Sequence, residues 1–207
     1  TRPDGRTLYD MASLTKVITL TTLAMMAVDD GRLDLDAPVV RYLPDFARGS
    51  GNKTAVRVRD LLLHDSGLPP GRPLWLETIV RAGGILRTVT TDRSAPPGTR
   101  MVYSDLGAIT LTAILEQLYG QRIDQLFATR VTKPLGLTRM RYLPPKGWLP
   151  QIAPTEKDPW RGRVLRGEVH DEHTARLGGV SGHAGLFRSA EHPPQFGREG
   201  ADPLDRW

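Results

Sequence analysis

The chain has 207 residues, of which 39% are hydrophobic and 25% charged, and none is cysteine. These values are typical of a globular protein and exclude a collagen-like chain, a disulfide-stabilised scaffold and a thiolate zinc site. The net charge of +5 comes from 28 basic and 23 acidic residues. Because the basic residues form no long run and only 6% of residues are aromatic, we expect no nucleic-acid partner.

The first predicted element is a helix over residues 12–29. Apolar side chains occupy nearly all of its faces, and Asp29-Asp30-Gly31 ends it. A helix of this kind is expected at the centre of a core. Its uncharged apolar part, residues 17–28, is shorter than the roughly 20 residues that cross a bilayer, so we expect no transmembrane segment.

Shorter helices are predicted in the next part of the chain. The pattern indicates them at 37–42, 58–64 and 74–82, with a further helical piece at 85–88. Proline and glycine at 95–98 break this pattern, because neither residue continues a helix well.

A long amphipathic helix is predicted to begin after a short extended piece at 101–103. Ser104 is placed to cap its first turn, and the periodic pattern runs to about Tyr119. Gly120 follows as the C-terminal stop.

The last third of the chain has fewer regular elements. A helix is expected at 123–131, and residues 137–185 are expected to be irregular with extended pieces at 140–143 and 163–165. No set of four or five alternating strands is present, so the sequence shows less strand than a complete enzyme that mixes helices with a sheet would. We expect one domain over 1–188 and an irregular tail over 189–207.

Ser13 and Lys16 form the motif with the clearest chemistry. They stand three residues apart at the start of the first helix, so their side chains share one face. A desolvated lysine can take the proton of a serine hydroxyl, and the helix N-terminus favours the negative charge that develops in acyl transfer. The alternative is a satisfied structural pair, but a lysine in the first turn of an otherwise uncharged helix is costly unless it has a partner. We therefore favour a catalytic pair.

Tyr103 is a second candidate, because it follows a Pro-Gly turn and directly precedes the long helix. A tyrosine hydroxyl near an ammonium can relay a proton to a leaving group. The alternative is a core tyrosine whose hydroxyl is hydrogen-bonded. The functional interpretation depends on Ser13 and Lys16 lying nearby.

Longer segments surround these motifs. They are Leu8-Tyr9-Asp10-Met11-Ala12, Gly31-Arg32-Leu33-Asp34-Leu35-Asp36, Asp60-Leu61-Leu62-Leu63-His64-Asp65-Ser66-Gly67-Leu68, Pro97-Gly98-Thr99 and Pro134-Leu135-Gly136-Leu137. Together with Ser-x-x-Lys and Tyr-x-Asp, they resemble the serine β-lactamase and penicillin-binding protein superfamily. The similarity is to its class C β-lactamase-like branch, which includes esterases, D-aminopeptidases and low-molecular-weight penicillin-binding proteins, and it runs from about residue 8 to residue 188.

The resemblance implies a role for each candidate. Ser13 would be the acylated nucleophile, Lys16 its proton acceptor and Tyr103 the residue that shuttles the proton. Asp105 stands where many members have asparagine and is the expected substrate-binding residue. The fold implied is α+β and β-lactamase/transpeptidase-like. This chain would carry mainly the helical part, with the antiparallel sheet incomplete.

The third motif of the superfamily, a Lys/His-Thr/Ala/Ser-Gly triplet on a strand, has two interpretations here. The letters His183-Ala184-Gly185 fit it. The wider segment 177–187 resembles instead a glycine-rich loop that precedes a helix in these relatives. In that case the true triplet, its strand and the strands that would precede Leu8 are absent.

His64 and a group of possible metal ligands are further candidates for a functional role. His64 ends a predicted helix, where a structural role in binding the last carbonyls is expected. Possible metal ligands gather near the end of the chain, but their spacing is not the i, i+4 pair of a helical zinc motif, so we expect no metal and no cofactor. These possible ligands are Glu168, His170, Asp171, Glu172, His173 and His183.

The sequence thus predicts a serine hydrolase that acts through an acyl-enzyme on an ester or amide. A β-lactam, a D-amino-acid peptide or a carboxylic ester would be the substrate, as a small molecule or peptide. The alternative is a truncated, inactive homologue or a binding module.

Overall fold

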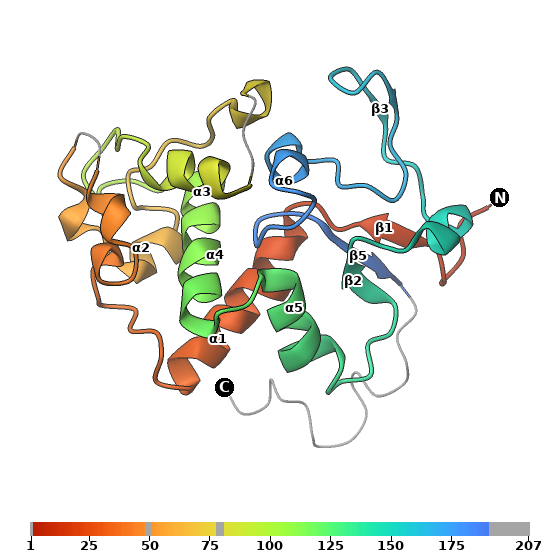
Figure 1. The fold of residues 1–207 in the computed structure, drawn as a ribbon, viewed down its shortest axis with the longest axis horizontal. Coiled ribbons are helices and arrows are strands. Elements are labelled where there is room, and N and C mark those ends of the chain that lie inside the picture. The colour runs from red at the N-terminus through yellow and green to blue at the C-terminus, as the bar shows by residue number, and fades with distance from the viewer. Residues whose placement is uncertain (1, 49–50, 78–80, 191–207) are drawn as a thin grey trace.

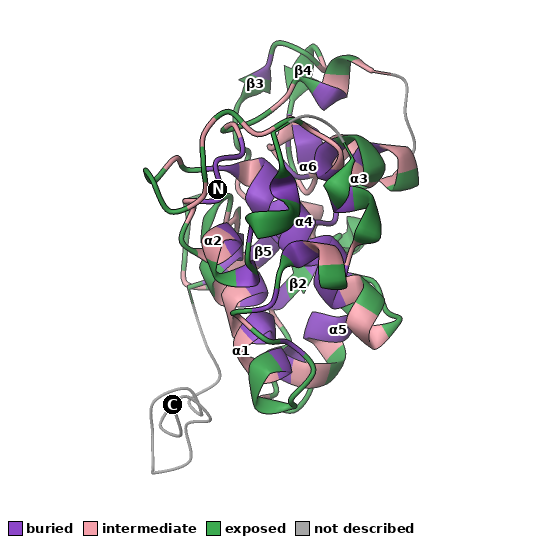
Figure 2. Cartoon of the chain, turned by 90° about the vertical axis from the view of Figure 1, so that its left-hand side faces the viewer, coloured by how far each residue is buried: buried purple, intermediate pink, exposed green. Residues whose placement is uncertain are grey.

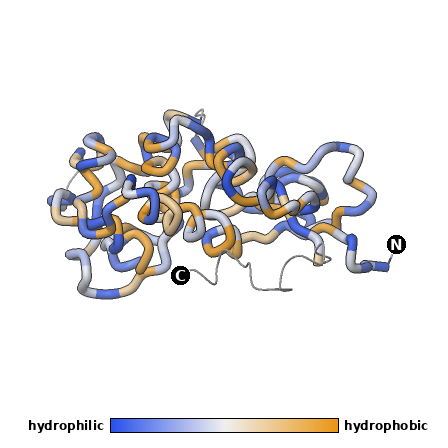
Figure 3. The backbone as a smooth tube through the Cα atoms, turned by 90° about the horizontal axis from the view of Figure 1, so that it is seen from below, coloured by the Kyte–Doolittle hydropathy of each residue, from blue (hydrophilic) through white to orange (hydrophobic). Residues whose placement is uncertain are grey.

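Helices make up most of the regular structure, and short antiparallel strands lie beside them (Figure 1). The computed structural model describes residues 2–48, 51–77 and 81–190. Polar and apolar segments alternate along the helical part of the chain, and the N-terminal end is polar (Figure 3). This alternation is expected for elements that bury one face and expose the other.

The helix α4 (Asp105–Tyr119) is the centre of the helical part. Its first ten residues after Asp105, from Leu106 to Leu115, are all buried (Figure 2). The helices α2 (Val58–Leu62) and α3 (Arg81–Val89) pack against it, and α1 (Thr22–Asp29) and α5 (Ile123–Phe127) also contact it (Figure 1). One hydrophobic core therefore joins segments from most of the described chain.

The helix that carries the Ser-x-x-Lys motif is not α-helical throughout. Lys16–Thr21 forms a π-helical turn that continues directly into α1. A π-helical turn also follows α5, at Ala128–Thr132. Short helices of the 3₁₀ type are found at Val39–Arg41, Pro44–Ala47, Lys53–Ala55, Leu74–Leu76 and Lys146–Gln151.

The sheet is small, as the sequence predicts. Three antiparallel strands have the spatial order β1-β5-β2, and they are β1 (Leu8–Asp10), β5 (Leu186–Ser189) and β2 (Met140–Tyr142). Strand β5 lies in the middle, with Tyr9 and Met140 both opposite Arg188. The strands β3 (Lys157–Asp158) and β4 (Arg163–Val164) form a separate two-stranded ribbon.

The long central helix agrees closely with its sequence signals. The Ser104 hydroxyl oxygen accepts a hydrogen bond from the Gly107 N–H and so caps α4. Gly120 ends the helix with a φ of 63°, the left-handed conformation that glycine adopts at little cost.

Several other expectations were wrong. In the segment 74–82, Leu74–Leu76 forms a 3₁₀ turn in place of an α-helix, residues 78–80 lie outside the described part, and α3 is described from Arg81. In the segment expected to be irregular, the helix α6 (Glu172–Arg176) forms because Asp171 caps it through the Thr174 N–H. The segment 101–103 forms no strand.

The first helix is also less buried than its composition suggests. Leu14 and Val17 are 57% and 63% exposed, so the prediction of burial on all faces was wrong for them. They stand three residues apart on one face, and no element among residues 2–48, 51–77 and 81–190 covers that face. Composition alone does not reveal which apolar face lacks a neighbour.

Among the described residues, no helix has the length and apolar character required to cross a membrane. The expected irregular tail falls almost entirely on residues 191–207, which lie outside the described part. Ser189 belongs to β5, and the domain boundary at residue 188 stays a prediction.

Candidate active site

Ser13 lies at the start of its helix, after strand β1 and a tight turn. Asp10 ends the strand, and its carboxylate accepts hydrogen bonds from the Ala12 N–H at 2.9 Å and the His170 N–H at 2.7 Å. Burial nevertheless raises the pKa of Asp10 above its usual value. Ala12 has a φ of 43°, a left-handed conformation that is unfavourable for a residue with a Cβ. The turn before Ser13 is thus strained and is held by Asp10.

The Lys16 side-chain nitrogen lies among three oxygen atoms. Nζ is 2.9 Å from the Ser13 hydroxyl, 2.7 Å from Oδ1 of Asp105 and 3.3 Å from the carbonyl oxygen of His183. Lys16 is buried, and its whole side chain is 8% exposed. The i, i+3 spacing therefore does bring Ser13 and Lys16 together, and the partners of the buried charge come from distant segments.

Tyr103 and Asp105 are positioned by the N-terminus of α4. The hydroxyl of Ser104, which lies between them, accepts from Gly107 and donates to the Pro69 carbonyl at 2.6 Å. Lys16 Nζ lies 4.7 Å from the centre of the Tyr103 ring, and Tyr103 is 50% exposed. All four residues expected from the sequence therefore lie around one point, with Tyr103 on its open side.

His64 supports the Tyr103 loop. Its ring lies 4.6 Å from the Tyr103 ring, its Nδ1 accepts from the Ser104 N–H, and its carbonyl accepts from the Val102 N–H. Burial and the nearby Lys16 charge hold the pKa of His64 below its usual value. A structural role was expected, but through the carbonyls of its own helix, whereas the contacts found hold the start of α4.

The loop before β5 approaches Lys16 through its backbone. The His183 carbonyl contacts Lys16, while the His183 ring is 1% exposed and bonds away from it. Its Nδ1 contacts the Ser181 hydroxyl at 2.8 Å, and its Nε2 contacts Asp171 at 2.8 Å and the Thr174 hydroxyl at 3.1 Å. The triplet 183–185 therefore leads directly into the strand β5, and a helix after this loop, as the resemblance implies, would lie outside the described residues.

The Asp171 carboxylate is held in its charged form. Burial by itself would raise its pKa, but the neighbouring His183 and the Thr174 N–H outweigh this and keep the pKa of Asp171 well below its usual range. Asp171 and His183 thus form a buried polar pair directly behind Lys16.

The six sequence candidates for metal ligation separate into two groups. Glu168 pairs with Arg163, His170 Nε2 contacts Glu156 at 2.7 Å, and Glu172 opens α6. The other three, Asp171, His173 and His183, lie together with Asp105, and one donor atom from each lies within 4.8 Å of all the others. Spacing could not reveal this group, because Asp105 is far from the other three along the chain.

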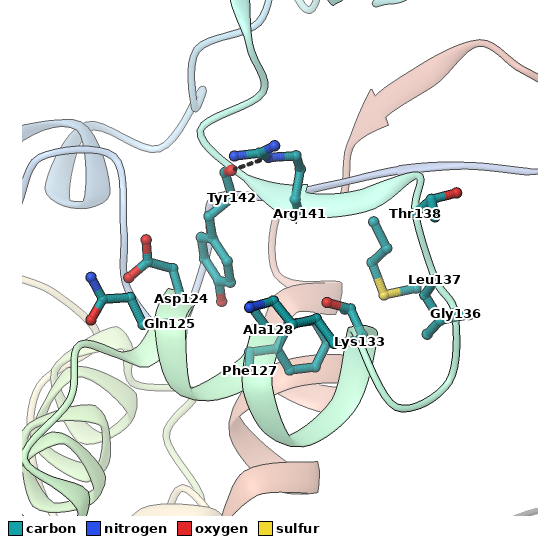
Figure 4. A pocket seen from close by; sticks show the side chains of 12 residues that line it. Asp124, Gln125, Phe127, Ala128, Lys133, Gly136, Leu137, Thr138, Arg141 and Tyr142 are labelled. Carbon is teal, nitrogen blue, oxygen red and sulfur yellow. Dashed lines mark hydrogen bonds between the residues drawn. The ribbon is translucent and has the colours of Figure 1, made fainter.

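A cavity of about 540 Å³ lies elsewhere, between α5, the π-helical turn after it and β2 (Figure 4). Its lining includes Asp124, Phe127, Lys133 and Tyr142, and none of Ser13, Lys16, Tyr103 or Asp105. This cavity is therefore separate from the Ser13–Lys16 group.

The arrangement around Ser13 suits nucleophilic chemistry. A hydroxyl in hydrogen-bond contact with an amine can pass its proton to that amine as it attacks a carbonyl. Asp105 supplies a counter-charge for the ammonium so formed. The Tyr103 ring lies beside the same amine, with its centre 4.7 Å from Lys16 Nζ, and a phenol in this neighbourhood is a candidate for proton transfer to a leaving group.

Comparisons with known proteins point to one family. The family model described as Beta-lactamase matches residues 1–203. An N-acetylmuramyl-L-alanine amidase of Bacillus subtilis is 36% identical over 213 aligned positions, which cover 90% of this chain and 48% of the relative. A putative D-alanyl-D-alanine carboxypeptidase of Escherichia coli K12 is 34% identical, with 87% and 48% covered. The chain thus spans about half the length of these curated relatives.

Solved structures agree in fold. A β-lactamase/D-alanine carboxypeptidase of Yersinia pestis matches with a TM-score of 0.71 and 22% identity, over 92% of this chain and 52% of that one. A class C β-lactamase of Rhodobacter sphaeroides matches with a TM-score of 0.69 and 26% identity, over 92% and 50%. The similarity of structure thus extends over nearly all of this chain.

Proposed function

The chain belongs to the beta-lactamase family, within the superfamily of serine β-lactamases and penicillin-binding proteins, and from that premise we propose that Ser13 is acylated by an amide substrate. The observation that carries the proposal is the 2.9 Å contact between the Ser13 hydroxyl and Lys16 Nζ. In this proposal Lys16 reacts as the neutral amine, and it accepts the hydroxyl proton while Ser13 Oγ bonds to the substrate carbonyl carbon. The leaving amine then takes a proton delivered through Tyr103, and water later releases the acyl group.

The strained turn at Ala12 supports the same role. It directs the chain from β1 into the helix so that the Ser13 backbone N–H lies at the helix N-terminus. An N–H at this position stabilises negative charge on a substrate oxygen. Strain kept in the residue next to a nucleophile is consistent with a functional constraint.

The substrate class is proposed from the relatives. One is named for an N-acetylmuramyl-L-alanine and another for a D-alanyl-D-alanine bond, and both names describe cleavage of an amide next to an alanine. An alanine-containing amide is therefore proposed ahead of a simple ester or a β-lactam. The half-exposed Tyr103 supports a site open to a substrate larger than a single amino acid.

A serine-reactive probe tests the acylation. We expect a fluorescent fluorophosphonate or penicillin to label the chain at Ser13, and Ser13→Ala to abolish the label. Ser94 is the matched control, because it is an exposed serine that bonds the Gly67 carbonyl and lies apart from Lys16. Ser94→Ala should label normally. A folded wild-type chain that takes up no label contradicts the proposal.

The second candidate is a binding module without activity. It is favoured by the uncovered apolar face at Leu14 and Val17. Incubation with N-acetylmuramyl-L-alanine and with D-alanyl-D-alanine, followed by chromatography, separates the two. Release of free alanine supports the enzyme, and saturable binding without release supports the module.

A further inference from the structure

Four side chains from three separate segments gather behind Lys16. Asp105 comes from the first turn of α4, Asp171 and His173 from the start of α6, and His183 from the loop before β5. One donor atom from each lies within 4.8 Å of all the others. We propose that these four residues bind a divalent transition-metal cation, for which Zn²⁺ is the probe.

The two imidazoles are prepared for this role by their outer contacts. His173 Nε2 contacts the Arg72 carbonyl oxygen and therefore donates to it, which leaves Nδ1 with its lone pair. His183 Nε2 donates to the charged Asp171 carboxylate, so a cation would displace this proton while Nδ1 donates to the Ser181 hydroxyl. Histidine ligands of metals are typically fixed in this way, with the second ring nitrogen bonded to an oxygen outside the site.

Burial and rigidity support the same conclusion. His173 and His183 are 6% and 1% exposed, so little side-chain entropy remains to be lost on binding. The Asp171 carboxylate is fixed by the Thr174 N–H at 2.7 Å. Three of the four donors are thus held in place before any cation arrives.

The donor set selects the kind of cation. Two imidazoles and two carboxylates suit zinc and its neighbours in the first transition series, whereas Ca²⁺ and Mg²⁺ prefer oxygen alone. Tetrahedral zinc with bonds of about 2.0–2.2 Å places its donors about 3.4 Å apart. The donor atoms of the four residues lie up to 4.8 Å apart, so their side chains must shift by on the order of 1 Å to reach the zinc spacing.

Asp105 makes the cation compete with Lys16. Its Oδ1 already lies 2.7 Å from Lys16 Nζ. A cation bound to this carboxylate is therefore repelled by the positive charge of Lys16 at short range. Removal of that charge should therefore strengthen zinc binding. Lys16→Met should lower the dissociation constant by about tenfold or more, whereas Lys16→Arg, which keeps the charge, should not.

The experiment measures metal directly and does not depend on catalysis. Metal-free wild-type protein is titrated with Zn²⁺ by calorimetry, and the bound metal is counted by elemental analysis after gel filtration. The chain has no cysteine, so thiolates contribute no background. We expect one zinc per chain, and Co²⁺ at the same site should give the visible absorption of a tetrahedral complex.

Variants locate the site. His173→Ala and Asp105→Asn should each weaken zinc binding by about tenfold or more, because each removes one ligand. His170 is the matched control, since it lies three residues before His173 but bonds Glu156 outside the cluster. His170→Ala should bind zinc as the wild type does. Far-ultraviolet circular dichroism verifies that every variant is folded.

Two results would overturn the proposal. One is a folded wild-type chain that retains no stoichiometric zinc. The other is equal zinc binding by wild type, His173→Ala and Asp105→Asn, which would place the metal elsewhere. Ser13→Ala keeps all four ligands and should retain zinc, so failure of the metal site and failure of the acylation at Ser13 are distinguishable.

Discussion

Lys16 combines contacts that the sequence predicts with contacts that it does not. The pairing with Ser13 follows from a spacing of three residues on one helix, and the 2.9 Å distance confirms the proximity. The contacts with Asp105 and with the His183 carbonyl depend on how α4 and the loop before β5 pack. No local pattern encodes that packing, which is why the group with Asp171 and His173 was missed.

Tyr103 allows the chemical role of one hydroxyl to be tested with little effect on the fold. Because the ring is 50% exposed and its ring contacts with Lys16 and His64 survive in phenylalanine, Tyr103→Phe should change stability by less than about 0.5 kcal/mol. Loss of the O–H should slow acylation of Ser13 by about 100-fold or more. Stopped-flow labelling with a fluorophosphonate measures this rate.

Tyr9 provides the control for that measurement. It is 40% exposed on β1 and lies outside the Ser13–Lys16 group. Tyr9→Phe should acylate at the wild-type rate. If Tyr103→Phe also does so, Tyr103 does not transfer the proton.

At the scale of elements, the loop before β5 is fixed against three helical segments at Gly182. The Gly182 N–H donates to the Thr112 hydroxyl of α4 at 3.0 Å. A Cβ at Gly182 would lie 2.5 Å from that hydroxyl oxygen and 2.7 Å from Cδ1 of Leu20. The same loop carries the His183 carbonyl to Lys16, so this close packing also determines the geometry of the candidate site.

Gly182→Ala should therefore destabilise the protein. The added methyl group must displace Leu20 or the loop itself, which costs about 1–3 kcal/mol of the free energy of unfolding. Gly147→Ala is the control, because nothing lies within 4 Å of a Cβ there. Urea unfolding measures the free energy of unfolding of both variants. Equal values for the two would show that the loop can move to make room for the methyl group without loss of stability.

How well elements could be predicted depended on their length and on local signals. The helix α4 has a serine cap, a long apolar period and a terminal glycine, and all three were identified. The strands β1 and β5 have three and four residues, too few for an alternating pattern to stand out. The Met11 N–H donates to the Leu186 carbonyl where these two segments meet. The pairing of the strands therefore depends on tertiary contacts, which a local sequence pattern does not contain.

At the scale of the whole molecule, the described chain combines a well-packed core with an uncovered face. The core extends from α1 through α4 to β5, whereas Leu14 and Val17 remain exposed beside Ser13. At this scale the comparison with the curated relatives also applies, since the chain matches about half the length of each. Composition predicted a core but could not indicate which of its faces lacks a partner.

Lys53 is a charge buried in this core. It is 1% exposed, and Nζ donates to the carbonyls of Val89 and Thr91 at 2.7 and 3.0 Å. It also lies 4.6 Å from the centre of the Phe46 ring. Burial lowers the pKa of Lys53 from 10.5 to about 8, and the nearby Asp92 offsets only part of this effect.

This shift makes the stability of the whole molecule depend on pH. Between about pH 8 and 10.5 the unfolded chain holds a proton on Lys53 that the folded chain has released, so the free energy of unfolding rises with pH in this range. Below pH 8 both states are protonated, and the destabilisation is constant. After allowance for solvent screening, the gain across the range should be on the order of 2 kcal/mol.

Lys53→Met isolates this contribution. The variant removes the titrating group while keeping an unbranched apolar chain against Phe46, so its stability should lack the rise between pH 8 and 10.5. Lys146→Met is the control, because Lys146 is exposed and should leave the rise unchanged. Urea unfolding at several pH values compares the three proteins. Parallel pH profiles of wild type and Lys53→Met would mean that Lys53 keeps its proton in the folded chain, with the two carbonyls and Asp92 sufficient to stabilise it.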